Sequence, residues 1–427
     1  MVNGELIIRG CFDATTGYGA HIRSHLRLLE RNGISFRLLY EPLDPNVISG
    51  EDILRWNKLV LKKSPLGSTV IHFLEACYYE ICEGCRNIGY TQWEVEGLPQ
   101  PTKLFNPDLQ WLENFNRCDE IWTGSSFAKE VYINAGVKVP IFVVPWVIGS
   151  DFPIKSPHPG LLHGIQIPPW NGCGNLHLAL RPIFKILSRL PSFVRLPFVS
   201  LGYLAFHTFS NLALKIHGWK LSFTKTTIEQ DKNFFTIVCA NTFNERKNFR
   251  DLIAAVHYEF RASDKVRLVI ATHHAVFSRW MRASVLSHIL KWVMGIKAAD
   301  APQTFVISQK LSEKEFLTFL SHADLFLSTS KGEGVGGGVL LSMALGVPVC
   351  THLFSSFKDY CDDQNAFIFE YSLEPVVWHF NFYGMRQRWA RPNMESLTRK
   401  LREAYELWKK KPRSTASQRK KRQKVCS

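Results

Sequence analysis

Short apolar runs recur along the chain, and segments with helical periodicity separate them. An apolar run of four to eight residues bounded by turn-forming residues is typical of a strand buried on both faces of a parallel sheet. Strands that alternate with helices in this way indicate α/β domains with doubly wound sheets. We assign strands to residues 6–8, 68–73, 87–90, 120–123, 141–145, 235–240, 266–271 and 324–329.

Two of these strands lead into glycine-bearing loops that precede helices. The strand 6–8 is followed by Gly17 and Gly19, and the strand 324–329 is followed by Glu333 and a run of glycines. Free N–H groups at a helix start bind anions, and glycines let a phosphate approach the backbone. Each loop therefore predicts a phosphate site, with a tight turn as the alternative. In the second loop the candidates are Gly334, Gly336, Gly337, Gly338 and Val339.

Glu333 is an unusual residue for such a loop. A carboxylate there would repel a phosphate, so we expect Glu333 to address a neutral hydrogen-bonding group beside it, such as a sugar hydroxyl. The alternative is a solvated glutamate next to a tight turn.

The second loop carries a recognisable motif, E-G-V-G-G-G-V-L-L-S-M-A-L-G-V-P-V. It resembles the donor-site motif of retaining, nucleotide-sugar-dependent glycosyltransferases of the GT-B fold, the family-four group (glycosyl transferases group 1). The family's second glutamate, which typically holds ribose hydroxyls, is replaced by Leu341. The matching positions are Glu333, Gly334, Gly336, Met343, Ala344, Gly346, Pro348 and Val349.

Other segments also resemble this family. Arg246 and Lys247 match its basic donor-site motif, and adjacent cations at a strand end can neutralise a leaving diphosphate. The alternative for these two cations is an exposed basic turn. By the same resemblance, Lys310 and Leu311 are candidates for contact with the base of the nucleotide. Thr91 and Glu94 follow the strand 87–90, where ligands bind in such sheets, and are weaker candidates for the acceptor side.

Composition bears on the number of domains, on metal binding and on the cellular compartment. The 427 residues are 46% hydrophobic and 21% charged, which is typical of a globular chain with two or three domains. The formal net charge is +15, but residues 409–424 contribute nine cations and no acid. The pair Cys82 and Cys85 has no second pair at zinc spacing, so we expect no metal site. Residues 1–9 do not have the pattern of a signal peptide, and we expect reduced thiols and a cytoplasmic protein.

Three segments suggest contact with other molecules. Residues 196–214 carry no charge and have basic flanks, which favours an anchor at an anionic membrane surface over a buried insertion or a membrane span. The broadly apolar helix expected at 277–296 is either buried or against lipid. The basic tail has no core-forming residues except Val425, so we expect disorder and either solvation or attraction to anionic lipid. Without interleaved aromatic residues, the tail does not favour nucleic acid as a partner.

These observations divide the chain into segments. We expect a helix at 393–410 that crosses back to the first domain, as a late helix usually does in the family. The division is an acceptor domain at 1–150, a linker or insertion at 151–232, a donor domain at 233–392, this helix at 393–410 and a disordered tail at 411–427.

The resemblance implies a GT-B enzyme whose two Rossmann-like domains face a cleft. It would transfer a sugar from a nucleotide-sugar to a sugar, lipid-linked or glycan acceptor, with retention of configuration and without a cofactor or a required metal. Arg246 and Lys247 would stabilise the departing diphosphate, and Glu333 would orient the donor sugar. Leu341 leaves open a catalytically silent GT-B protein that acts as a membrane-associated binding module. A nucleotide-sugar epimerase of related architecture would need a catalytic acid and base that we cannot assign.

Overall fold

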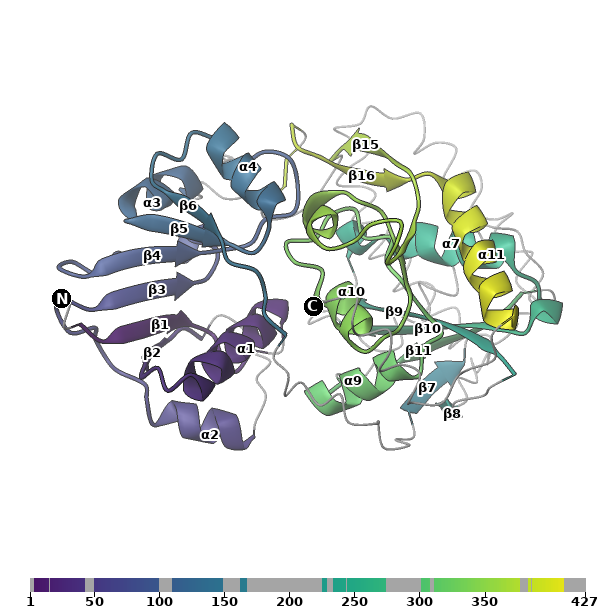
Figure 1. Ribbon diagram of the computed structural model, residues 1–427, viewed down its shortest axis with the longest axis horizontal. Coiled ribbons are helices and arrows are strands. Elements are labelled where there is room, and N and C mark those ends of the chain that lie inside the picture. Colours follow the sequence, from purple (N-terminus) through teal and green to yellow (C-terminus); the bar gives the residue numbers. More distant parts are fainter. Residues whose placement is uncertain are drawn as a thin grey trace, which may run out of the picture.

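The protein folds into two α/β domains that lie side by side (Figure 1). The structure is a computed structural model. It describes residues 4–14, 16–42, 50–99, 110–148, 162–166, 225–228, 233–242, 244–273, 301–307, 311–376, 383–384 and 386–410.

The first domain contains a parallel sheet with the strand order β2-β1-β3-β4-β5-β6. Helices α1 (Gly17–Arg31) and α2 (Glu51–Asn57) cover one face of this sheet, where Leu26 and Trp56 are buried. Helices α3 (Trp111–Arg117) and α4 (Ser126–Asn134) cover the other face. The strands are β1 (Leu6–Gly10), β2 (Arg37–Tyr40), β3 (Thr69–Phe73), β4 (Arg86–Tyr90), β5 (Glu120–Thr123) and β6 (Ile141–Val143).

The second domain contains a larger sheet with the order β14-β13-β12-β9-β10-β11-β7-β8. The pairs among its first six strands are parallel, whereas β7 (Leu162–Gln166) and β8 (Lys225–Ile228) join antiparallel beside β11. The parallel strands are β9 (Phe235–Thr242), β10 (Val266–His273), β11 (Gln303–Ile307), β12 (Leu325–Leu327), β13 (Val349–Thr351) and β14 (Phe367–Ile368). The helices are α7 (Phe249–Glu259), α9 (Glu313–Ser321), α10 (Gly337–Ala344) and α11 (Met394–Lys410).

This architecture confirms the predicted fold class. Each run that we assigned to a strand lies on a strand of one of the two sheets. The reason is that both sheets are covered on both faces, so central strands such as β1, β4, β9 and β12 bury most of their side chains and appear in the sequence as apolar runs.

The expected path of the last helix is wrong. Helix α11 stays on the second domain, where Leu397, Leu401 and Tyr405 share a core with α7. The hairpin formed by β15 (Tyr371–Pro375) and β16 (Arg388–Pro392) packs against the first domain instead.

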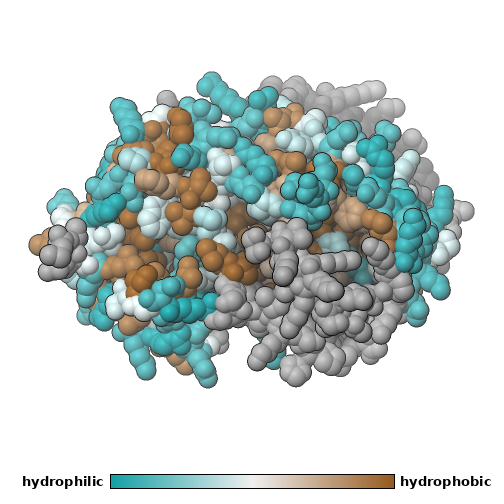
Figure 2. Space-filling view, in the orientation of Figure 1, coloured by the Kyte–Doolittle hydropathy of each residue, from teal (hydrophilic) through white to brown (hydrophobic). Residues whose placement is uncertain are grey.

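The hairpin completes a hydrophobic core between the domains. Trp389 and Ala390 of β16 and neighbouring Val376 are buried in one cluster with Trp93 and Trp111 of the first domain. Figure 2 shows hydrophobic side chains on the face of the first domain that reach the junction with the second. The two domains are therefore joined by packing as well as by the chain.

Several predicted features lie outside the described residues: Lys310, the apolar segment 196–214, the helix at 277–296, the tail 411–427 and most of the linker 151–232. Within the described part of the chain, no helix is long and apolar enough to cross a membrane. The eight cysteines described there are free thiols.

Candidate active site

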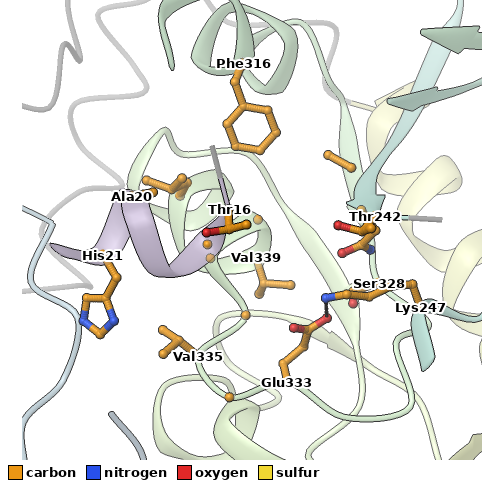
Figure 3. A pocket seen from close by; sticks show the side chains of 18 of the residues that line it. Thr16, Ala20, His21, Thr242, Lys247, Phe316, Ser328, Glu333, Val335 and Val339 are labelled. Atoms are coloured by element: carbon orange, nitrogen blue, oxygen red, sulfur yellow. Dashed lines mark hydrogen bonds and ion pairs between the residues drawn. The ribbon is translucent and has the colours of Figure 1, made fainter. Parts of the chain in front are cut away.

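A cavity of about 430 Å³ lies between the two domains. It sits at the carboxyl ends of the central strands of both sheets, which is where parallel α/β sheets bind ligands. The first domain contributes the start of α1 and the residues after β4. The second domain contributes the ends of β9, β10 and β12 and the starts of α9 and α10. Figure 3 shows Thr16 and His21 from α1 and its cap on one side, with Lys247 and Glu333 on the other.

Three of the predicted residues meet in a buried cluster of charges. Lys247 Nζ forms an ion pair with Glu333 Oε1, and Arg246 Nη1 lies 3.4 Å from Glu333 Oε2. Arg246 Nη1 also donates a hydrogen bond to the carbonyl of Gly332 at 2.5 Å. The turn after β9 positions both cations, because the side chain of Asn244 accepts from the backbone N–H of Lys247 at 3.1 Å.

The first domain adds a second carboxylate to this cluster. Glu94 Oε1 lies 3.2 Å from Arg246 Nε and accepts a hydrogen bond from the hydroxyl of Tyr383. Glu94 was predicted on the acceptor side, whereas sequence reasoning missed Tyr383. No local motif marks Tyr383, because only the return of the chain to the first domain brings it to a residue 289 positions earlier.

Pairing sets the charge state of the cluster. Burial alone would raise the pKa of Glu333, but Lys247 and then Arg246 outweigh it and lower that pKa to about 2. Burial and the neighbouring Arg246 lower the pKa of Lys247. Burial acts in the same direction on Arg246, but its carboxylate neighbours, Glu94 first, raise its pKa overall. Two cations therefore face two carboxylates, and the cluster is close to neutral.

Three glycines of the second loop lie in close contact with residues of the first domain. A Cβ atom on Gly332 would lie 2.1 Å from the carbonyl oxygen of Glu94. A Cβ on Gly334 would lie 2.7 Å from Gln92 Cβ, and one on Gly337 would lie 2.5 Å from Trp146 Cζ3. These glycines are thus required for the close approach of the two domains.

At Gly336 the backbone conformation, and not the contact with the first domain, favours glycine. Its φ of +74°, in the left-handed region, starts α10 and favours glycine. The hydroxyl of Tyr360 donates to the neighbouring carbonyl of Val335 at 2.7 Å and so fixes the loop.

Leu341 forms part of an apolar wall of the cavity. Its side chain is buried in one cluster with Val339, Phe326 and Leu317, and Leu311 packs against that cluster. All five residues line the cavity. At position 341, where the family motif has its second glutamate, this protein therefore has an apolar side chain among apolar neighbours.

Residues 235–373 match the family model of the glycosyl transferases group 1. The second domain is a group 1 glycosyl transferase domain. The match covers the turn with Arg246 and Lys247, the loop with Glu333 and the apolar wall, and it confirms the family that the motif predicted for this part of the chain.

Solved structures show the fold of the whole chain. Sucrose-phosphate synthase from Thermosynechococcus elongatus matches with a TM-score of 0.53 at 10% identity, over 99% of this chain and 95% of that one. A glycosyltransferase from Rickettsia africae matches with a TM-score of 0.51 at 11% identity, over 99% of this chain and 92% of that one. At this identity the likeness shows the GT-B fold alone. The chain also spans 57% of the length of S. aureus TarM, at a TM-score of 0.44. No curated protein sequence matches the chain.

Most predicted residues of the glycosyl transferase domain and its partner domain line the cavity. Gly19 and Thr91 are not among the lining residues. Gly19 backs onto the carbonyl of Ala14, and buried Thr91 shares a hydrogen bond of 2.9 Å with the hydroxyl of Tyr18. The predicted residues that line the cavity are Gly17, Glu94, Arg246, Lys247, Leu311, Glu333, Gly334, Gly336, Gly337, Gly338 and Val339. Across the described residues, no group of three or more His, Cys, Asp or Glu side chains is placed to hold a metal ion.

Proposed function

We propose that the protein is a hexosyltransferase that moves a sugar from a nucleotide-sugar to an acceptor with retention of configuration. The observation that carries this proposal is the buried cluster of Arg246, Lys247 and Glu333, because it lies in a group 1 glycosyl transferase domain at the edge of a cavity between two domains. The acceptor is proposed to be a sugar, a lipid-linked sugar or a glycan.

In this proposal the two cations act on the leaving group. Negative charge grows on the diphosphate as the glycosidic bond breaks, so fixed positive charges in a water-poor site stabilise the transition state more than the ground state. Because Arg246 and Lys247 can supply this charge, we propose that the reaction requires no metal ion.

The ion pairs of the two cations imply what must happen first when the donor binds. Glu333 and Glu94 form ion pairs with Arg246 and Lys247. An incoming diphosphate therefore has to replace at least one of these carboxylates as the partner of a cation. Displaced Glu333 would then accept hydrogen bonds from hydroxyls of the donor sugar, and displaced Glu94 would face the acceptor from the first domain.

A ligand screen tests the proposal directly. The full chain is mixed with UDP-, GDP-, ADP- and dTDP-sugars, and both thermal stabilisation and release of free nucleotide are measured. We expect one nucleotide class to raise the melting temperature, because a ligand that binds only the folded state stabilises it. No shift and no nucleotide release with any sugar nucleotide would contradict the proposal.

One observation favours a second function. The apolar wall around Leu341 and the near-neutral charge cluster are also compatible with a GT-B protein that binds a partner without catalysis. In that case a nucleotide binds without any release of sugar. The same screen distinguishes the two functions.

A further inference from the structure

One buried serine behind the cavity has an unusual backbone conformation. Ser355 is the first residue of a 3-10 helix (Ser355–Asp359), is 1% exposed and has a φ of +61°, in the left-handed region. Among the described residues, the other non-glycine residues with a positive φ are Asn248 and Lys265, and each caps the carboxyl end of a 3-10 helix. Helices commonly end with a residue in that region. Ser355 begins a helix, so this ordinary explanation does not apply to it.

The surroundings of Ser355 hold this conformation in place. A side chain is strained in the left-handed region, and such strain persists where the structure around it fixes the backbone, often at functional sites. Both Phe354 and Phe357 are buried, and Phe354 packs on Phe127 of α4 with ring centroids 5.1 Å apart. Asp359, at the other end of the short helix, accepts from the N–H of Ser126 at 2.7 Å. The first domain therefore helps to fix this segment of the second.

The side chain of Ser355 contacts the backbone of Glu333. Ser355 Oγ accepts a buried hydrogen bond from the N–H of Glu333 at 2.8 Å, and the N–H of Ser356 donates to the carbonyl of Glu333 at 3.3 Å. Figure 3 shows the carboxylate of the same residue directed toward Lys247. Two consecutive serines thus hold both backbone polar groups of the residue whose carboxylate pairs with the cations of the cavity.

His352 fixes the start of the same loop. Its Nδ1 accepts from the N–H of Phe354 at 3.1 Å, which leaves the proton on Nε2, and Nε2 donates to the carbonyl of Ser330 at 2.7 Å. Burial lowers the pKa of His352 to about 4, so the ring is neutral at physiological pH and can keep this arrangement. The loop is therefore held before Glu333 as well as at Glu333.

We propose that Ser355 is a positioning residue that orients Glu333, so that the carboxylate of Glu333 meets Lys247. Ser355 does not line the cavity, so it acts through Glu333. Glycine would suit the backbone of this position better, but it would leave the buried N–H of Glu333 without the hydroxyl that accepts from it. The importance of this contact for catalysis rests on the proposed function.

A double-mutant cycle on stability tests the positioning without any substrate. Urea midpoints are measured for wild type, Ser355→Gly, Glu333→Gln and the double variant. Glu333→Gln keeps the backbone that Ser355 contacts and removes the carboxylate. It should lower the midpoint less in the Ser355→Gly background than in wild type, because contacts that depend on each other are not additive. If Glu333→Gln does not fold, Lys247→Met replaces it, since it breaks the same ion pair.

Turnover gives a second readout. With the UDP-, GDP-, ADP- and dTDP-sugars of the ligand screen, Ser355→Gly should lower kcat by about three- to tenfold, the factor that corresponds to one hydrogen bond. It should lower kcat no further when Glu333 is already glutamine.

The backbone strain has a separate test in Ser355→Ala. Alanine and glycine both lack the hydroxyl, and glycine alone adopts the left-handed region without a steric penalty. Ser355→Ala should therefore melt at a lower temperature than Ser355→Gly, which is the reverse of the order at an ordinary helical position.

Lys265→Gly is the matched control for relief of strain. Lys265 also has a positive φ, of +53°, but it is exposed and does not line the cavity. This variant should raise the melting temperature. It should leave kcat, and the midpoint loss caused by Glu333→Gln, unchanged.

The outcomes separate this inference from the proposed function. Additive midpoints in the cycle, or wild-type kcat in Ser355→Gly of an active protein, would show that Ser355 only stabilises the loop and would overturn the inference alone. A melting temperature of Ser355→Ala above that of Ser355→Gly would contradict the strain on which it depends. Non-additive midpoints in a protein that turns over no sugar nucleotide would refute the proposed function and would still show that Ser355 orients Glu333.

Discussion

The two glycine-bearing loops share one local design and differ in what their glycines meet. Each loop follows a parallel strand and starts a helix at the cavity. A Cβ atom on Gly17 of the first loop would meet nothing within 4 Å. A Cβ on Gly334 or Gly337 of the second loop would collide with side chains of the first domain.

The difference shows that a glycine motif does not by itself specify a ligand. At Gly334 and Gly337 the missing side chains make room for the opposite domain, whereas at Gly17 the missing side chain leaves open space in the cavity wall. The cations differ as well, because Arg246 and Lys247 near the second loop form ion pairs with carboxylates, whereas Arg23 near the first loop donates to the backbone carbonyls of Phe12 and Ala14.

The largest expected effect concerns the apolar wall of the second domain. Leu341→Glu should destabilise the protein by about 3–5 kcal/mol, because it buries a carboxylate among the apolar side chains of Val339, Phe326 and Leu317. Urea unfolding measures the change. Leu341→Met keeps the volume and should cost less than about 1.5 kcal/mol. A glutamate variant that is as stable as wild type and binds nucleotide more tightly would show that the wall is not packed as described.

Lys247→Ala should lower turnover by about 100- to 1000-fold while changing donor affinity less, because the charge on the leaving group grows in the transition state. Steady-state kinetics with the donor found in the ligand screen separates the two quantities. Lys331→Ala is an informative comparison, since Lys331 is also a buried lysine paired with carboxylates but does not line the cavity. Wild-type turnover in Lys247→Ala would remove this residue from the site.

A matched pair of alanine variants tests the comparison of the two loops. Gly337→Ala should cost about 1–3 kcal/mol, because its Cβ would overlap Trp146, and Trp146 is itself stacked on His21 with ring centroids 5.0 Å apart. Gly17→Ala should change stability by less than about 0.5 kcal/mol. Thermal unfolding of both variants measures the two stability losses. Equal losses would mean that the loops play the same role.

The smallest expected effect is the pH dependence that Glu333 contributes. Its lowered pKa means that its ion pairs stabilise the fold fully above about pH 4.5 and that this stabilisation is lost as the pH falls through about 2. The stability difference between wild type and Glu333→Gln should therefore be constant from about pH 5 to pH 8. Denaturant midpoints at several pH values test this, and a slope in that interval would contradict the ion pair.

Much of the fold was predictable because buried parallel strands appear as apolar runs. The hairpin β15–β16 was not, because its strands contain exposed charged residues such as Arg388 and Arg391 and bury Trp389 against a domain that is distant in sequence. The expected return of α11 failed for the same reason. An amphipathic pattern shows that a helix has a face to bury and does not show which domain covers that face.

The candidate site was predictable where residues act through a local motif. Arg246, Lys247 and Glu333 follow strand ends at positions that the resemblance supplies, and the structure brings them together. Tyr383 was missed, because its significance is a contact with Glu94 of the first domain, which is distant in the sequence.

The hairpin has a consequence for domain exchange. A chimera that joins the first domain of this protein to the second domain of another GT-B protein would leave Trp93 and Trp111 without Val376, Trp389 and Ala390. Large aromatic side chains would then lose their cover, and the hybrid would tend to aggregate. Recombination between such proteins should therefore succeed more often when residues 371–392 are inherited together with the first domain, although they follow most of the second domain in the sequence.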